Sequence, residues 1–204
     1  TGTAGLLALA RQFKNHPVPP KRSIVFLSVT AEESGLLGSA WYGENPVFPL
    51  AQTVANINID AMGMNGSMKD VVVVGYGSSE LEDYLQTAVE AAGRYITPEP
   101  TPERGFYYRS DHFNFAKHGV PALYAEGGID HHEFGKAYGE QKAQEYTDIA
   151  YHQPADEFNP DWDPSGAVDD LSLLFSVGYT LSQQSTFPEW YEGNEFKAIR
   201  DQQR

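Results

Sequence analysis

Hydrophobic positions along this chain follow two different periods. Some segments repeat apolar residues every three or four positions, which predicts helices with one buried face. Others are short, continuous apolar runs, which are typical of strands buried on both faces of a sheet. The helical pattern covers residues 3–15, 80–92 and 166–181. The strand pattern covers residues 23–29, 54–60, 71–74 and 120–125.

The longest of these helices, over 166–181, is expected to bury one apolar side. The residues predicted to face inward are Val168, Leu171, Leu174, Phe175 and Tyr179. Two shorter helices are predicted, one from Ser34 to Tyr42 and one over 110–117. The stretch 126–146 is rich in glycine, charge and aromatic residues, and we interpret it as an inserted loop.

Strands and helices alternate along the chain. This order predicts an α/β fold, a three-layer α/β/α sandwich around a mixed, largely parallel sheet. We expect residues 1–186 to form one unit and residues 187–204 to form a tail whose Trp190 and Tyr191 pack on it. Because no initiator methionine or signal core is seen, we interpret the chain as the interior of a longer protein. We also expect the first strands of the fold to be missing from it.

The chain has 204 residues and a formal net charge of -14. Such a charge repels nucleic acid phosphates and anionic membrane surfaces, so we expect neither as a partner. No apolar run approaches the ~20 residues that a membrane span needs. The chain contains no cysteine, so any transition metal must be held by His, Asp or Glu.

Charged side chains follow two of the predicted strands. Glu32 and Glu33 follow the first strand, Asp60 ends the second, and His152 lies in a polar loop before the last helix. Each has an ordinary structural alternative, since acidic residues favour helix starts and turns and a loop histidine is commonly solvated. Together they are oxygen and imidazole ligands suited to zinc. A carboxylate next to a metal-binding carboxylate can take a proton from the water that attacks the substrate.

Four segments resemble the motifs of metallopeptidase family 28, which includes leucyl-type aminopeptidases and glutamate carboxypeptidase II. They occur in the family's order, and the resemblance extends from Thr1 to about Leu181. The segments are AEESGLLGS at 31–39, NINIDAMG at 56–63, SDHFNF at 110–115 and YHQPAD at 151–156.

The resemblance implies a role for each matching residue. Glu32 is the general base, Glu33 and His152 are ligands of one zinc ion, and Asp60 is a ligand of a second. Asp156 supports the ligand loop, and Ser110 and Asp111 shape the pocket. Tyr107 or Tyr108 donates a hydrogen bond to the developing oxyanion, with packing as the alternative for both.

The family pattern also has an earlier histidine and an aspartate that bridges the two metals, and neither is in this chain. By the resemblance, only three of the five usual ligands remain. We therefore expect the parent protein to bind two zinc ions and to remove N-terminal residues from peptides. We expect this chain by itself to bind zinc weakly or not at all and to be inactive.

Three alternatives to an aminopeptidase remain open. They are a carboxypeptidase or dipeptidase of the same family, a glutaminyl cyclase-like acyltransferase, and a receptor-like ectodomain without catalytic activity. His131 and His132 could form another metal site, but we favour a solvated loop for both. We expect a periplasmic or secreted protein. The sequence does not indicate an oligomeric state.

Overall fold

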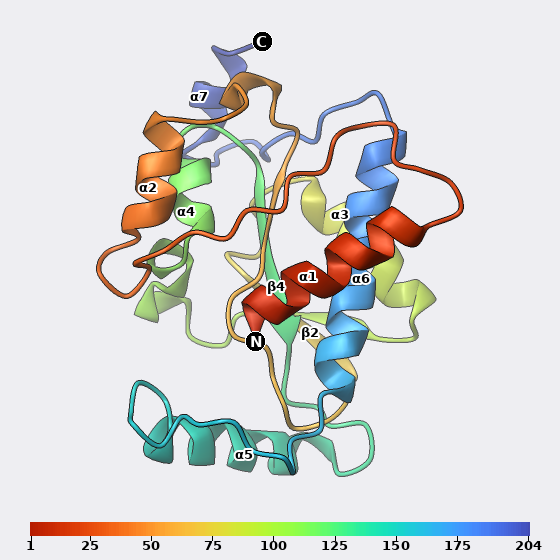
Figure 1. Cartoon of the computed structure of the whole chain (residues 1–204), viewed down its shortest axis with the longest axis vertical. Coiled ribbons are helices and arrows are strands. Elements are labelled where there is room, and N and C mark those ends of the chain that lie inside the picture. Colours follow the sequence, from red (N-terminus) through yellow and green to blue (C-terminus); the bar gives the residue numbers. More distant parts are fainter.

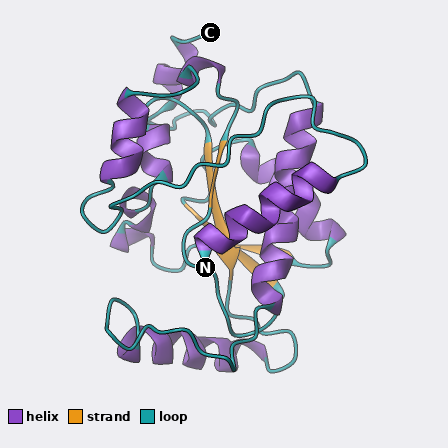
Figure 2. Ribbon diagram, in the orientation of Figure 1, coloured by secondary structure: helices purple, strands orange, loops and turns teal.

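The computed structural model describes residues 1–204 and contains a four-stranded sheet with helices on both sides (Figures 1 and 2). The strands are β1 (Asn56–Asn58), β2 (Asp70–Val74), β3 (Tyr95–Pro98) and β4 (Ala122–Gly127). The helices are α1 (Gly2–Asn15), α2 (Leu37–Glu44), α3 (Leu81–Ala91), α4 (His112–Ala116), α5 (Gly135–Ile149), α6 (Ser165–Gln183) and α7 (Lys197–Asp201), with short 3-10 turns at Leu50–Gln52, Pro102–Arg104 and Phe106–Arg109.

The sheet has the strand order β1-β4-β2-β3. β1 runs parallel to β4, and β2 runs parallel to β3, while β2 and β4 are antiparallel. The pairing brings Asn58 beside Tyr124, so the ends of β1 and β4 point toward the same edge of the sheet. The mixed, largely parallel sheet confirms the predicted fold class. The sequence analysis missed β3, which has only one partly buried apolar residue, Ile96.

Two hydrophobic clusters cover the two faces of the sheet. On one face, Val71, Val73 and Leu123 pack against α3 and α6. On the other face, Val74 and Ala122 pack against α4, the turn at 106–109 and the C-terminal segment. The helices over 3–15, 80–92 and 166–181 are confirmed as α1, α3 and α6. Gly93, at φ +69°, adopts the left-handed conformation that ends α3.

The inward face predicted for α6 is wrong at one position. Val168 is 58% exposed, whereas Leu174 is buried as expected. Leu173, Val177 and Leu181 complete the buried side of the helix. α6 packs against α3, α1 and the sheet, and the periodicity alone does not specify which positions of its first turn these contacts cover.

The predicted strand over 23–29 does not form. This segment follows α1 and crosses the front of the molecule toward α2 as extended chain that pairs with no strand (Figure 1). Leu27 packs against the cluster around Phe115, while Val25 is 49% and Phe26 is 39% exposed. A strand requires a partner for its backbone N–H and C=O groups, and this segment pairs with no strand of the sheet.

The predicted loop at 126–146 is also wrong, because most of it is helix α5. α5 lies apart from the sheet at the lower end of the molecule (Figure 1). Its only buried residue is Gly139, where a side chain would collide with the backbone of Ile129. The helix therefore lacks the broad apolar face that makes a helix recognisable in a sequence.

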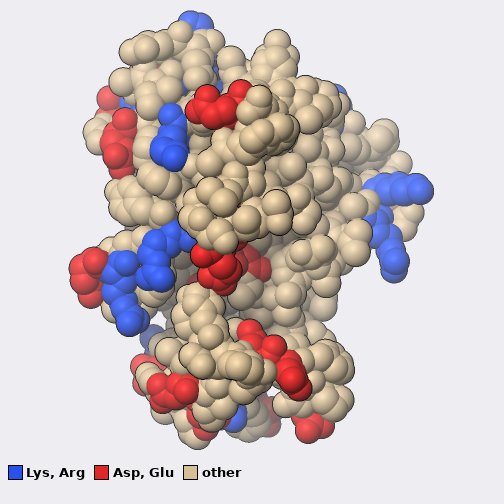
Figure 3. Space-filling model, turned by 60° about the vertical axis from the view of Figure 1, so that its left-hand side comes forward, with Lys and Arg blue, Asp and Glu red and all other residues tan.

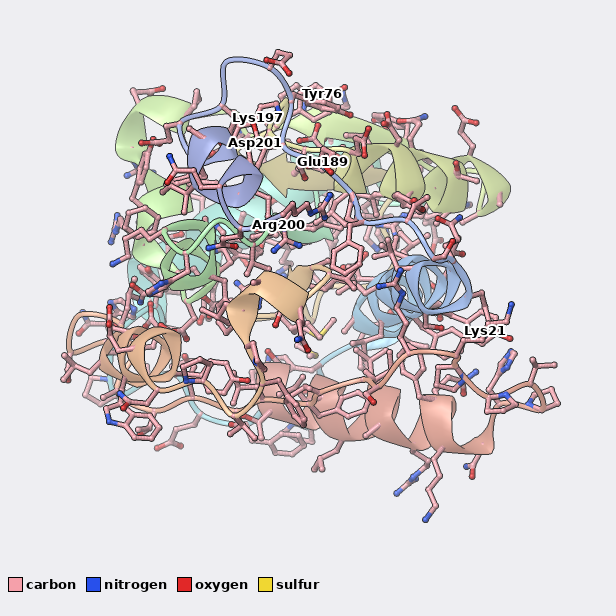
Figure 4. The ribbon with its side chains drawn as sticks, turned by 90° about the horizontal axis from the view of Figure 1, so that it is seen from above. Lys21, Tyr76, Glu189, Lys197, Arg200 and Asp201 are labelled. Carbon is pink, nitrogen blue, oxygen red and sulfur yellow. The ribbon has the colours of Figure 1, made fainter.

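The C-terminal segment packs on the rest of the chain. Trp190 is 1% exposed and donates a hydrogen bond from Nε1 to the carbonyl of Gly119 at 2.9 Å. Arg200 points from α7 into the interior and donates from Nη2 to the carbonyl of Thr53 at 2.8 Å (Figure 4). These two contacts show that residues 187–204 pack on the rest of the chain, as expected. The division of the chain at residue 186 stays a prediction.

Candidate functional site

The turn that carries Glu32 and Glu33 is tightly hydrogen-bonded. The amides of Gly35 and Leu36 both donate to the carbonyl of Glu32, at 3.0 and 2.9 Å. Ala31 and Leu36 both adopt left-handed backbone conformations, at φ 56° and 58°. Such conformations cost roughly 1–2 kcal/mol in residues other than glycine, so the surrounding contacts must hold this turn in place.

The structure brings His152 to Glu33. His152 Nε2 lies 3.0 Å from Glu33 Oε1, and both side chains are at least half exposed. His152 has a left-handed φ of 57°, and the ring of Tyr151 stacks on its imidazole with centroids 3.9 Å apart. Two residues from distant segments thus meet with an imidazole nitrogen and a carboxylate oxygen side by side.

Asp60 lies just beyond β1, where hydrogen bonds fix its carboxylate. Ser110 Oγ donates to Asp60 Oδ2 at 2.7 Å and accepts from Asn58 Nδ2 at 2.9 Å. Ala61 N donates to Asp60 Oδ1 at 2.9 Å. Ser110 therefore contacts a predicted metal ligand, while its role in shaping the pocket stays a prediction.

Negative charge concentrates around Glu32. Partial burial raises the pKa of Glu32, and the nearby carboxylates of Asp60, Glu33 and Asp111 raise it further, while His152 lowers it. Burial also raises the pKa of Asp111, with a further contribution from Asp60. Acidic side chains gather where the lower lobe, which carries α5, meets the body of the molecule (Figure 3). A bound cation would relieve the repulsion between these carboxylates.

The donor set fits zinc in kind but is incomplete in number. Imidazole nitrogen and carboxylate oxygen are ordinary zinc ligands, and Glu33 and His152 present one of each to the same space. However, no group of three or more His, Cys, Asp or Glu side chains is placed to hold one ion together. The chain therefore supplies two adjacent candidate ligands for one ion, Glu33 and His152, and Asp60 is not grouped with them.

The other predicted residues lie close in sequence but make different contacts. Tyr107 is buried, its ring packs against His112, and its hydroxyl has no hydrogen-bond partner. Tyr108 donates from its hydroxyl to Glu195 at 2.9 Å. Asp156 accepts from the hydroxyl of Tyr146 at 3.1 Å and makes no hydrogen bond to His152. Their proposed roles in oxyanion stabilisation and ligand support stay predictions.

His131 and His132 belong to no group of three or more His, Cys, Asp or Glu side chains placed to hold one ion. His132 is exposed, as expected for a solvated loop. His131 is 8% exposed and differs from that expectation, because its Nδ1 accepts hydrogen bonds from the amides of Glu133 and Phe134. His131 therefore stabilises the backbone of the loop before α5.

Glu126 is a buried carboxyl that the sequence analysis did not single out. It lines a small cavity of about 10 Å³ together with Asp60 and Asp170. Burial, followed by the charges of Asp60 and Asp170, raises the pKa of Glu126 to about 7. Its signal in the sequence is a single acidic residue at the end of an otherwise apolar strand.

Comparisons with known proteins agree with this arrangement. Residues 1–176 match the family model described as Peptidase family M28. The chain resembles the structure of an aminopeptidase from Aneurinibacillus sp. strain AM-1, with a TM-score of 0.62 and 19% identity over 90% of this chain and 39% of that one. It also resembles the LapA aminopeptidase of Legionella pneumophila, with a TM-score of 0.61 and 16% identity over 90% of this chain and 46% of that one.

A sequence relative is a vacuolar membrane protease of Pyricularia oryzae, which is 41% identical over 56 residues, or 28% of this chain and 6% of the relative. The chain thus spans less than half the length of each of these proteins. None of its own helices is both long and apolar enough to cross a membrane. Because the family model matches most of the sequence, the chain belongs to peptidase family M28.

Proposed function

We propose that this chain carries most of the catalytic groups of a zinc-dependent aminopeptidase. The observation that carries the proposal is the approach of His152 Nε2 to Glu33 Oε1 at 3.0 Å, next to the partly buried carboxyl of Glu32. An imidazole nitrogen and a carboxylate oxygen are ordinary zinc ligands. The match to Peptidase family M28 and the likeness to two aminopeptidase structures favour an aminopeptidase over a carboxypeptidase.

Glu33, His152 and Asp60 are the residues that would hold zinc. Glu33 and His152 are already adjacent, and Ser110 and Asn58 fix the orientation of Asp60. When bound, zinc supplies Lewis-acid polarisation of the scissile carbonyl and activation of water. By the family resemblance, a histidine and an aspartate from outside this chain complete the ligand set. We infer that the 204 residues alone are inactive for that reason.

Glu32 is suited to move the proton in peptide hydrolysis. In this reaction, a water oxygen bonds to the carbonyl carbon, the C–N bond breaks, and one water proton reaches the leaving amine. Glu32 takes that proton and passes it to the amine nitrogen.

Substrate pairs that differ at one terminus test the proposal. The protein containing this chain together with the missing ligands should hydrolyse leucine p-nitroanilide but not the N-acetylated analogue, which lacks the ammonium. A peptide with a blocked N-terminus and a free C-terminal carboxylate should not be shortened. Release of its C-terminal residue would instead support a carboxypeptidase.

The expected periplasmic or secreted location stays a prediction.

A further inference from the structure

The turn with Glu32 and Glu33 is held from outside by a buried residue of α4. Asn114 is 2% exposed, and its Nδ2 lies 3.2 Å from the carbonyl oxygen of Leu36 and 2.8 Å from Ser39 Oγ. The two acceptors sit at the end of the turn and in the first turn of α2. A single amide group therefore links α4 to both sides of the junction where the turn becomes helix.

Ser39 extends this link to the predicted pocket. Ser39 is fully buried, and its hydroxyl donates to Asp111 Oδ1 at 2.5 Å, with the carbonyl oxygen of Leu36 at 3.1 Å. Asp111 directly precedes α4 and is one of the carboxylates that raise the pKa of Glu32. The chain of hydrogen bonds from Asn114 to Ser39 to Asp111 thus joins two segments that face the same site.

The need for this link follows from the backbone of the turn. Leu36 lies at φ 58° and ψ 35°, the left-handed region that residues with a Cβ seldom occupy. Without outside contacts, Leu36 would relax toward an ordinary conformation and turn the preceding residues with it. Since Glu32 accepts backbone hydrogen bonds from Gly35 and Leu36, that relaxation would reorient the two glutamates.

We propose that Asn114 is a positioning residue, which holds Leu36 in its left-handed conformation and thereby aims Glu32 and Glu33. The effect on catalysis rests on the proposed aminopeptidase function. The effect on the turn does not, because it concerns only hydrogen bonds within this chain.

The first test is amide hydrogen exchange in the 204-residue chain. Asn114→Ala should speed exchange at Leu36, Leu37 and Gly38, whose amides donate within the turn, about tenfold more than at amides in the middle of α6. The matched control is Ser182→Ala, which removes a buried hydroxyl that bonds only the carbonyl of Tyr179 in α6. If Asn114→Ala accelerates exchange equally throughout the chain, its role is general stability and the proposal is wrong.

The second test is rescue by glycine, which adopts the left-handed region without steric cost. In the complete peptidase, Asn114→Ala should lower kcat by about ten- to a hundredfold with little change in KM, because misplaced catalytic groups lose rate at unchanged binding. In a Leu36→Gly background the same substitution should lower kcat by less than about threefold, because glycine adopts the left-handed conformation without the hydrogen bonds of Asn114. An equal loss in both backgrounds overturns the proposal.

Two further outcomes are also decisive. If Asn114→Ala does not fold, Asn114→Leu keeps the shape of the side chain without its hydrogen bonds and is measured in the same way. If the complete protein cleaves no peptide, the aminopeptidase function is wrong, and amide exchange alone decides whether Asn114 holds the turn. Unchanged exchange at Leu36 in a folded variant contradicts the proposal.

Discussion

His152 Nε2 and Glu33 Oε1 lie 3.0 Å apart, although they come from distant segments of the chain. Glu33 belongs to the turn before α2, and His152 belongs to the loop after α5. Their approach joins the lower lobe to the body of the molecule at the candidate site. It is also the contact that gives the chain a pair of zinc-compatible donors within reach of one ion.

Zinc binding by the 204-residue chain should be weak and confined to one site. Two protein ligands fall short of the three or four that hold zinc firmly, and Asp60 should bind no ion of its own. In a calorimetric titration, His152→Ala should abolish the binding, while His132→Ala, which changes an exposed histidine, should leave it unchanged. Two tight sites in this chain would refute the assignment of the missing ligands.

The 204-residue chain should not turn over amino-acid p-nitroanilides. The family's bridging aspartate is not among these residues, and without a bridging carboxylate two cations repel each other at close range. The complete protein should be active and lose its activity on treatment with a chelator. Chelator-sensitive turnover by the purified chain itself would show that three ligands suffice.

His112 should contribute a loss of stability in mild acid, whereas Glu126, whose pKa is raised by burial, contributes in the opposite direction. Burial lowers the pKa of His112 to about 4, and neither ring nitrogen has a hydrogen-bond partner. Above its ordinary pKa of about 6.5 the side chain is neutral in both states, so no stability is lost there. As the pH falls from about 6.5 to 4, only the unfolded state takes up the proton. This costs up to ~1.4 kcal/mol per pH unit.

The matched comparison is His112→Phe, which keeps an aromatic ring and cannot be protonated. Urea unfolding at several pH values should show that, as the pH falls from about 6.5 to 4, this variant loses less or gains more unfolding free energy than the parent chain. An identical pH slope in the parent chain and in His112→Phe would mean that His112 is not buried as a neutral group.

Most of the fold could be predicted from the sequence because its central elements are periodic or strongly apolar. The long apolar faces of α1, α3 and α6 and the apolar run of β2 leave one reasonable interpretation each. Residues 23–29 show the limit of that reasoning. Their composition is that of a strand, but whether a strand forms depends on a neighbour that local sequence does not reveal. Helix α5 was not predicted because it has no apolar face in its sequence: its only buried residue is Gly139.

Only those residues of the candidate site that lie in recognisable sequence motifs could be predicted. The sequence located Glu33 and His152, and the structure brings them together. The contacts of Asn114 and Ser39 could not be predicted, because they depend on how α4 packs against α2. Likewise, the high pKa of Glu126 depends on burial beside Asp60, which requires knowing that β1 and β4 are neighbours.

The most direct test of the aminopeptidase assignment is kcat on leucine p-nitroanilide for the complete protein and its Glu32→Gln variant. Glutamine keeps the shape of the side chain but cannot accept the proton, and general acid–base groups typically contribute ~10²–10⁴-fold to the rate. We predict a loss of that size with the zinc content nearly unchanged, because Glu33, Asp60 and His152 remain in place. A variant that keeps more than about a tenth of the parent kcat, well outside that range, would contradict the role of Glu32.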